Sequence, residues 1–306
     1  MKRSTDGAMD LESQPQLAAA IIERNFDGAQ LQRVTRLTGG VSADVYRLYL
    51  RRASGEAASV VLRVHGASHS GHAASLEFTL LRALSEAGVP VAEPLALDTS
   101  GEIIGYPYLI MAFVDGSTSR PSGDESGYFA RMASALAGVH RTPLDALPAL
   151  PRRVDPVPEL LDFLPEDDRW DKLRRRLATM SGTTYEDIPR LLHGDFWPEN
   201  LLWHGGELAA ILDWEDAAIG DPLSDVACCR LELRYRYGRS GMSAFTKAFE
   251  AHASLDDKRL ALWQIYVAAA AHKYMGDWGL PSEKEAHMHR VALVTMEESA
   301  SVLLAP

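Results

Sequence analysis

The sequence predicts an α+β chain in two lobes, a small N-terminal lobe with an antiparallel sheet and a larger, mainly helical C-terminal lobe. Three observations support this prediction. The chain has 306 residues, which correspond to about two domains at ~150 residues each. Short apolar segments of β type fill the first third of the chain, and residues 223–304 have mostly helical periodicity.

The N-terminal lobe is expected to hold its strands around one helix. A short helix over residues 16–24 follows Pro15, a residue that favours the first turn of a helix. Leucines between residues 76 and 84 recur at helical spacing, and Gly88 provides a C-terminal stop for that second helix. Strands are predicted over residues 33–37, 45–50, 59–64, 94–97 and 108–113.

The lobe boundary is placed at residue 113, within a hinge expected near residues 111–114. The N-terminal lobe then covers residues 1–113, with a flexible tail over residues 1–14, and the C-terminal lobe covers residues 114–306. A small-molecule site is expected between the two lobes, because such sites often lie at domain interfaces.

Within the C-terminal lobe, one helix and one hairpin are predicted ahead of the long helical region. Residues 128–140 place their apolar side chains on one helical face. Apolar residues 201–203 and 208–212 flank the glycine pair at 205–206, a pattern typical of a β-hairpin. The proline-rich stretch over residues 143–158 is expected to be irregular.

The composition is that of a globular protein, with 46% hydrophobic and 24% charged residues. A net charge of −11 argues against a nucleic-acid partner, because phosphate contacts need clustered Lys and Arg, and it tilts slightly toward a cationic ligand. No apolar run reaches the ~20 residues of a membrane-spanning helix, so no membrane partner is expected. The adjacent Cys228 and Cys229 are poorly placed for a disulfide, which favours the reducing cytoplasm.

The densest functional signal is the segment HGDFWPEN at residues 193–200, followed by DWE at residues 213–215. Kinases use a catalytic Asp, four intervening residues, a magnesium-binding Asn and then a second magnesium-binding Asp. Asp195 and Asn200 have this spacing, and Asp213 follows 13 residues after Asn200, beyond the predicted hairpin.

Phosphoryl transfer has a physical need for these residue types. Mg²⁺ prefers oxygen ligands, so the Asp213 carboxylate and the Asn200 amide oxygen suit the ion that neutralises the phosphates. A separate carboxylate must orient the acceptor hydroxyl and take its proton, and Asp195 is the candidate for that catalytic role.

These motifs, together with Gly220-Asp221-Pro222 and Asp225, resemble those of the aminoglycoside phosphotransferase family, which is related to choline kinases and more distantly to protein kinases. The resemblance extends from about residue 37 to the helices near residue 280. It implies a two-lobed, protein-kinase-like fold. It also implies ATP-dependent transfer of the γ-phosphate to a hydroxyl of an aminoglycoside-like antibiotic, an amino alcohol or a sugar. Antibiotic resistance is one role such an enzyme could have.

The resemblance also indicates nucleotide-binding residues in the N-terminal lobe. Gly39, Gly40 and Ser42 lie where the family has a loop over the phosphates, and glycines let backbone amides approach phosphate oxygens. Arg63 stands where kinases usually have a Lys that holds phosphates, and Glu77 is its expected helical partner. This departure leaves open whether Arg63 fully replaces the Lys.

The cofactor expected from the family is ATP with Mg²⁺, with GTP as an alternative nucleotide, and adenine is expected to meet the backbone at Met111 and Phe113. His193, Asp221 and Asp225 are expected to brace the catalytic loop rather than touch substrate. A small-molecule acceptor is favoured over a protein because Trp197 removes a cation that protein kinases often carry there. The candidate acceptor pocket contains Trp197, Glu215, Glu232, His272, Tyr274 and Asp277.

Three alternatives remain open. A protein kinase is disfavoured by the short segment between Asp213 and Gly220, which has no room for a long activation loop. A pseudokinase scaffold would lack one of the three signature residues, and all three are present. A metal-dependent hydrolase built on His193, Asp195 and Asp213 would not require Arg63. The identity of the acceptor and the choice between monomer and homodimer also stay open.

Overall fold

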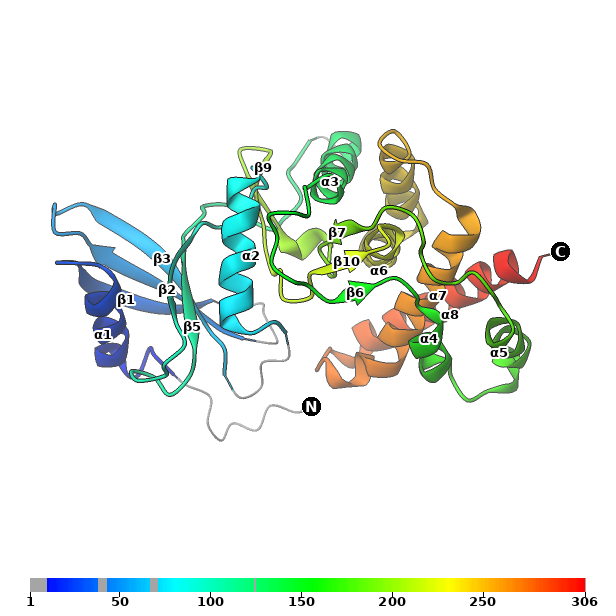
Figure 1. The fold of residues 1–306 in the computed structure, drawn as a ribbon, viewed down its shortest axis with the longest axis horizontal. Helices are drawn as coiled ribbons and strands as arrows, with labels where there is room; N and C mark the ends of the chain where they lie inside the picture. Colours follow the sequence, from blue (N-terminus) through cyan, green and yellow to red (C-terminus); the bar gives the residue numbers. More distant parts are fainter. Residues whose placement is uncertain (1–9, 38–42, 67–70, 124, 306) are drawn as a thin grey trace.

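The computed structural model describes residues 10–37, 43–66, 71–123 and 125–305 and has the two lobes that the sequence predicts (Figure 1). The sheet of the N-terminal lobe lies on one side of the molecule, and the helices α4 to α8 lie on the other. Helix α2 stands between the sheet and the C-terminal lobe.

The N-terminal lobe is a five-stranded antiparallel sheet with the strand order β1-β2-β3-β5-β4. Its elements agree with the predicted segments to within a few residues. They are α1 (Pro15–Asn25), β1 (Gln30–Leu37), β2 (Asp44–Arg51), β3 (Ala57–Val64), α2 (Ala74–Glu86), β4 (Pro94–Asp98) and β5 (Tyr108–Ala112).

The two helices of this lobe serve different cores. Helix α1 buries Ile21 and Ile22 against Tyr46 and Leu48 of β2, which closes the apolar interior of the N-terminal lobe. The leucines of α2 belong instead to a core shared with the C-terminal lobe. Gly88 ends the helical stretch with a φ of 80°, a conformation that glycine adopts without strain.

The C-terminal lobe begins with α3 (Glu125–His140) and ends with three long helices. Its remaining elements are β6 (Arg152–Arg153), α4 (Val157–Phe163), α5 (Asp171–Ala178), β7 (Arg190–Leu192), β8 (Leu201–His204), β9 (Glu207–Ile211), β10 (Ala218–Gly220), α6 (Leu223–Phe249), α7 (Asp257–Tyr274) and α8 (Ser282–Leu304). The predicted hairpin is confirmed, since β8 and β9 pair around Gly205 and Gly206. The proline-rich stretch that was expected to be irregular contains β6, which pairs with β10.

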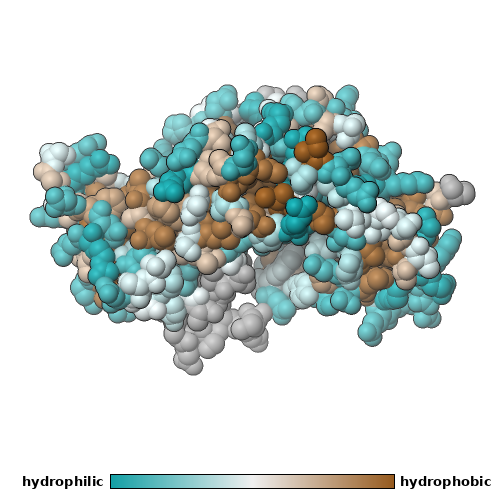
Figure 2. Space-filling model, viewed as in Figure 1, coloured by the Kyte–Doolittle hydropathy of each residue, from teal (hydrophilic) through white to brown (hydrophobic). Residues whose placement is uncertain are grey.

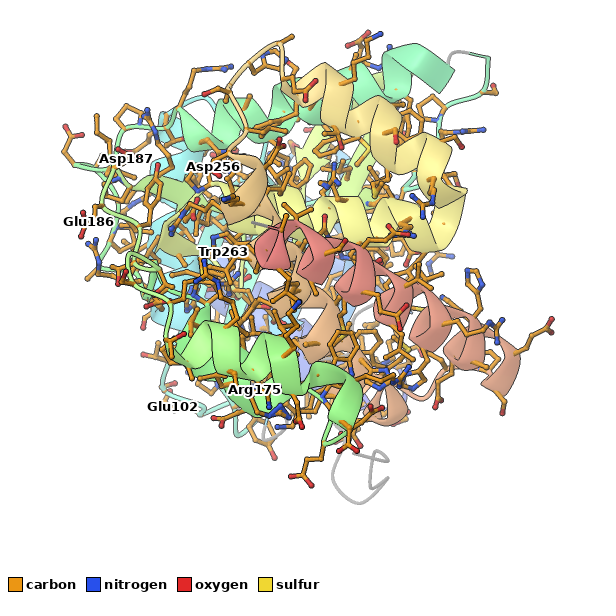
Figure 3. All side chains as sticks on the ribbon, turned by 90° about the vertical axis from the view of Figure 1, so that its right-hand side faces the viewer. Glu102, Arg175, Glu186, Asp187, Asp256 and Trp263 are labelled. Atoms are coloured by element: carbon orange, nitrogen blue, oxygen red, sulfur yellow. The ribbon has the colours of Figure 1, made fainter. Side chains whose placement is uncertain are left out.

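Helices α4, α5, α7 and α8 form a separate apolar core around residues such as Leu160, Leu173, Ile265 and Met296. Figure 3 looks onto this end of the molecule, where Trp263 lies inside the helical layer and Glu186 and Asp187 lie at its margin. The C-terminal lobe therefore has two parts, a central part that contains residues 193–200 and an outer helical part.

Hydrophilic residues cover much of the face in Figure 2, and hydrophobic ones show between the lobes and over the sheet. Across the described ranges, no helix combines the length and apolar character that crossing a bilayer requires.

Candidate active site

Residues 193–200, called the catalytic loop here after their expected role, lie between β7 and β8 and contact α6. The buried carboxylate of Asp225 accepts hydrogen bonds from the backbone N–H groups of His193 (2.8 Å) and Gly194 (2.9 Å), and from His140 Nε2 (3.1 Å). Burial raises the pKa of Asp225, but the hydrogen bond and charge of His140 outweigh it, so the net pKa is lowered. A charged acceptor thus fixes the two peptides that precede Asp195.

His193 is a structural member of the loop. Its Nε2 lies 2.8 Å from the carbonyl oxygen of Leu212, and its Nδ1 accepts the N–H of Asp195 at 3.2 Å. Burial lowers the pKa of His193, so the ring is neutral, and these two contacts require the proton on Nε2. The expected bracing role of His193 agrees with this geometry.

Gly194 is required by a close approach of two chain segments. Its φ is 88°, and a Cβ built there would lie 2.1 Å from the backbone oxygen of Asp216. Only glycine fits, because real Cβ atoms are not found at that distance. The loop therefore packs directly on the segment after Asp213.

The carboxylate of Asp195 has two different oxygens. Oδ2 accepts hydrogen bonds from Trp197 Nε1 and Asn200 Nδ2, each at 3.1 Å, whereas Oδ1 has a contact to Cys228 Sγ at 3.9 Å. Burial and the carboxylates of Asp213 and Asp216 raise the pKa of Asp195 to about 7, against the two hydrogen bonds. A carboxylate with a pKa near neutrality is suited to accept a proton.

The two predicted magnesium ligands lie on either side of the hairpin. The side-chain nitrogen of Asn200 donates hydrogen bonds to the backbone oxygen and to the carboxylate of Asp195. The side-chain oxygen of Asn200 therefore faces away from these groups and is a possible metal ligand. Asp213 has a φ of 61°, unusual for a residue with a side chain. No group of three or more His, Cys, Asp or Glu in the described chain has metal-binding geometry. A carboxylate and an amide oxygen nevertheless fit Mg²⁺, which takes its other ligands from water and phosphate.

Arg63 connects the lobes through ion pairs. From β3, its guanidinium reaches Asp213 Oδ1 at 3.1 Å, Glu215 Oε2, and Glu77 Oε2 of α2 at 3.3 Å. The Arg63 and Glu77 side chains are 9% and 3% exposed, so neither charge is solvated by water and each needs the other. Burial lowers the pKa of Arg63 while the three carboxylates raise it, and the net direction is upward.

The expected acceptor residues are only partly brought together. Trp197 donates to Asp195, and Glu215 pairs with Arg63. Glu232 lies on α6, where burial and the charges of Asp195 and Glu199 raise its pKa to about 8. The remaining three expected residues lie at or after the C-terminal end of α7. His272 contacts His289, Tyr274 packs on Phe163, and Asp277 is exposed after α7.

The structure describes only some of the residues expected to bind the nucleotide. Gly39, Gly40 and Ser42 lie outside the described residues. Met111 is in β5, and Phe113 follows Ala112, the last residue paired in that strand. The guanidinium of Arg47 lies 3.5 Å from the centre of the Phe113 ring.

A polar cavity of 360 Å³ adjoins the catalytic loop. Its lining includes Gly71, Arg153, Glu159, Asp216, Trp263 and Tyr266. Arg153 Nη1 donates to the carbonyl oxygen of Gly194 at 3.2 Å, and Tyr266 donates to Glu159 at 2.6 Å. Through Arg153, the lining of the cavity contacts the backbone of Gly194, the residue that precedes Asp195.

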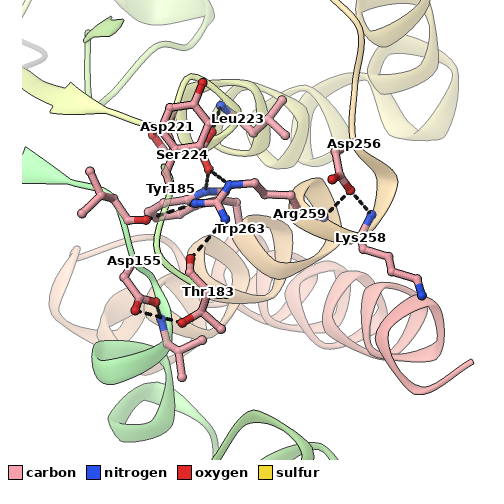
Figure 4. Close-up of polar contacts among 12 residues, drawn as sticks. Asp155, Thr183, Tyr185, Asp221, Leu223, Ser224, Asp256, Lys258, Arg259 and Trp263 are labelled. Carbon is pink, nitrogen blue, oxygen red and sulfur yellow. Dashed lines mark hydrogen bonds and ion pairs between the residues drawn. The ribbon is translucent and has the colours of Figure 1, made fainter. Parts of the chain in front are cut away.

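Asp221 holds Trp263, a lining residue of this cavity, within a network of polar contacts that Figure 4 shows. Its buried carboxylate accepts hydrogen bonds from Arg259, Trp263 and the backbone N–H of Leu223. Arg259 in turn donates to the carbonyl oxygens of Thr183 (3.1 Å) and Val154 (3.1 Å). The expected bracing role of Asp221 agrees with these contacts.

Three residues of the site were not anticipated. His65 Nε2 lies 3.1 Å from Glu77 Oε2, and the two-residue period of a strand already places His65 on the same face as Arg63. Cys228 follows Asp225 at helical spacing, which gives a weak signal. For Arg153 the sequence has no comparable signal, because its contact joins segments 41 residues apart.

Comparison with known families supports the motif assignment. The sequence model of the phosphotransferase enzyme family matches residues 33–263. This range runs from the first strand of the sheet to Trp263 in α7 and contains the catalytic loop, Asp213 and Arg63.

The curated relatives match about half of the chain. Acyl-CoA dehydrogenase family member 10 of Mus musculus is 34% identical over 182 residues, which are 52% of this chain and 16% of the relative. Homoserine kinase of Methylocella silvestris is 28% identical over 166 residues, which are 49% of this chain and 50% of the kinase. The chain therefore matches a small part of the first relative and half of the second.

Solved structures share the fold over nearly the whole chain. A thermostable mutant of an aminoglycoside phosphotransferase, in a ternary complex with AMP-PNP and hygromycin B, has a TM-score of 0.64 at 15% identity. That match covers 92% of this chain and 97% of the other. A choline/ethanolamine kinase family protein of Mesorhizobium loti has a TM-score of 0.60 at 16% identity, with 96% and 94% covered.

Proposed function

The chain belongs to the phosphotransferase enzyme family, and from this premise we propose that it transfers the γ-phosphate of ATP to a hydroxyl of a small molecule. One observation carries the proposal: Asp195 contacts Asn200, Arg63 pairs with Asp213, and the Asp213 carboxylate is near enough to Asp195 to help raise its pKa, so the four candidate residues lie near one another.

Each residue has a role in the proposed reaction. Asp195 accepts a hydrogen bond from the acceptor hydroxyl and takes its proton as the new O–P bond forms. The bond between the γ-phosphorus and the bridging β–γ oxygen breaks in the same step, and ADP leaves with that oxygen. Arg63 binds phosphate oxygens with its planar guanidinium once the nucleotide competes with its carboxylate partners. Asp213 and Asn200 would hold Mg²⁺, which supplies charge neutralisation of the phosphates when bound.

The acceptor is proposed to bind in the 360 Å³ cavity beside the catalytic loop. Asp216 and Glu159 can accept hydrogen bonds from hydroxyl or ammonium groups, and Arg153 can donate to an acidic group. The carboxyl group of Glu232 on α6, whose raised pKa reflects in part the charge of Asp195, adds a further hydrogen-bonding group near Asp195. A compact, polar acceptor with more than one hydrogen-bonding group suits this lining.

The proposal is tested by measuring ADP release from MgATP with a panel of acceptors. The panel follows the names of the similar proteins: hygromycin B, choline, ethanolamine and homoserine, with a simple sugar added. One member is expected to raise ADP release and to yield a phosphomonoester detectable by mass spectrometry. Asp195→Asn should lower this acceptor-dependent ADP release by roughly 10²–10⁴-fold.

Other outcomes of the same assay identify the alternatives. Metal-dependent release of inorganic phosphate from ATP at the same rate with and without an acceptor, and with no phosphorylated acceptor, would favour a hydrolase. Incorporation of phosphate into a generic protein such as casein, with none into the panel, would favour a protein kinase. MgATP binding without turnover on any acceptor would favour a nucleotide-binding scaffold.

A further inference from the structure

One face of α6 follows the catalytic loop. Asp225, Cys228 and Glu232 recur at spacings of three and four residues, which places them on the same side of the helix. Asp225 binds the backbone N–H groups of residues 193 and 194, and Cys228, one turn later, reaches the side chain of Asp195. The helix thus touches the loop at successive residues.

The two oxygens of Asp195 are held unequally. Oδ2 has two nitrogen donors at 3.1 Å, Trp197 and Asn200. Among the described residues, the hydrogen-bond partner of Oδ1 is the thiol of Cys228, with Sγ 3.9 Å away. A thiol is a weak and long donor, so Oδ1 can still accept a hydrogen bond from a hydroxyl.

We infer that Cys228 is a positioning residue for Asp195: its thiol holds Oδ1 toward the acceptor while Trp197 and Asn200 hold Oδ2. The inference rests on the proposed role of Asp195 in phosphoryl transfer. The charges of Asp213 and Asp216 also reach Asp195, and these carboxylates repel an ionised Oδ1 rather than hold it.

The chemical state of the thiol agrees with this role. Burial raises the pKa of Cys228 well above its usual range, so the side chain keeps its proton and can act as a donor. A serine hydroxyl would retain the donor, whereas alanine or valine would remove it. Valine also retains most of the side-chain volume and so separates hydrogen bonding from packing.

Cys229 provides a matched control in the same helix. Its side chain is buried in the apolar core that the two lobes share. Successive residues of a helix point about 100° apart, so Cys229 does not face the loop. Cys229→Ala removes the same atoms as Cys228→Ala, one residue away.

The first measurement reads the geometry without any acceptor. The indole N–H of Trp197 donates to Asp195, and the chain has 6 tryptophans, so the indole region of an ¹H–¹⁵N spectrum is resolvable. Trp197→Phe assigns the resonance. We expect it to move in Cys228→Ala and Cys228→Val and to keep its place in Cys228→Ser and Cys229→Ala. An unmoved resonance in the first two variants would overturn the inference.

The second measurement compares kcat with KM, using MgATP and the panel member that supports turnover. Cys228→Ala and Cys228→Val should lower kcat about three- to tenfold, the effect of one neutral hydrogen bond, with the KM for MgATP unchanged. Cys228→Ser should recover much of the loss. Parental kcat in Cys228→Val would show that only packing matters and contradict the inference.

Asp195→Asn separates this inference from the proposed function. Full turnover in Asp195→Asn would refute the role of Asp195, and with it the proposed mechanism. Loss of turnover in Asp195→Asn, combined with parental behaviour of all Cys228 variants in both measurements, would refute the role of Cys228 alone.

Discussion

At the scale of single residues, the site depends on carboxylates whose surroundings differ. Asp225 is buried but accepts three hydrogen bonds, so it stays ionised and structural. Asp195 has neighbouring carboxylates and a raised pKa, which suits proton transfer. Asp213 lies opposite Arg63 and is the carboxylate assigned to the metal. In the proposed mechanism, aspartate side chains thus have three different roles: brace for Asp225, base for Asp195 and metal ligand for Asp213.

Asp213→Ala tests the metal assignment. Calorimetry should show that Mg²⁺ strengthens ATP binding to the parent and no longer does so in the variant, because the ligand oxygen is gone. Asp213 also pairs with Arg63, so affinity measured with EDTA serves as the reference for any effect without metal. Asp187→Ala, at an exposed position, is the control. A magnesium effect that survives in Asp213→Ala would contradict the assignment.

Glu232→Gln tests the environment of the α6 carboxyl. Its pKa is raised to about 8 from 4.5, so between these values the folded state holds a proton that the unfolded state releases. The free energy of unfolding of the parent therefore falls as pH rises through this range, by at most about 1.4 kcal/mol per pH unit. The variant has no such group, so its stability relative to the parent should increase from pH 5 to pH 9 in urea titrations. Equal slopes in both proteins would show that Glu232 titrates normally, and Glu186→Gln, at an exposed site, should match the parent.

At the scale of elements, α6 contacts the catalytic loop through hydrogen bonds and an ion pair. Asp225 in its first turn fixes two loop peptides, and Arg236 further along pairs with Glu199 at 2.6 Å. One helix therefore contacts the loop near both of its ends. A shift of α6 would therefore be expected to move the backbone that carries Asp195.

Asp225→Asn tests this coupling. An amide has one acceptor oxygen, so one of the backbone N–H groups of His193 and Gly194 loses its partner and faces an NH₂ group instead. The cost should be about 1–3 kcal/mol in the free energy of unfolding, with a fall in kcat as the loop loosens. Chemical denaturation and steady-state kinetics measure the two effects. Asp187→Asn should change neither the free energy of unfolding nor kcat. Parental values of both quantities in Asp225→Asn would contradict the bracing role of Asp225.

The sequence predicts most elements because their signals are local. Alternation marks the strands of the sheet, and the glycine pair at 205–206 marks the hairpin. It does not predict β6, whose pairing with β10 joins segments far apart in the chain. The motif identifies Asp195, Asn200 and Asp213, but not that Trp197 would turn its indole N–H onto Asp195.

At the scale of the whole molecule, the two lobes share one apolar core. Leu80 and Leu84 of α2 and Leu109 of β5, from the N-terminal lobe, belong to one apolar cluster with residues of α3, α6 and the catalytic loop. The lobes also meet where the N–H of Ile211 donates to the carbonyl oxygen of Pro90 at 2.7 Å. Arg63 reaches across the same junction to Asp213 and Glu215. Arg63, the proposed phosphate-binding cation, and Asp213, the proposed metal ligand, are thus held on opposite lobes.

Substitutions of Arg63 test this connection. Arg63→Ala should raise the KM for ATP and lower the melting temperature, because Glu77 and Glu215 lose a buried counter-charge. Arg63→Lys keeps the charge without the planar fork and should retain part of the activity. Arg51→Ala on the exposed end of β2 is the control for kinetics and thermal unfolding. If both Arg63 variants match the parent in KM, another cation must bind the phosphates.

The central claim is that Asp195 acts on the acceptor hydroxyl and not on the nucleotide. Asp195→Asn, nearly identical in shape, tests it most directly when calorimetry of MgATP binding and acceptor-dependent turnover are measured on the same preparation. A general base contributes roughly 10²–10⁴-fold, so turnover should fall by that factor while MgATP affinity stays at the parental value. Near-parental turnover, or an equally large loss of MgATP affinity, would contradict the claim.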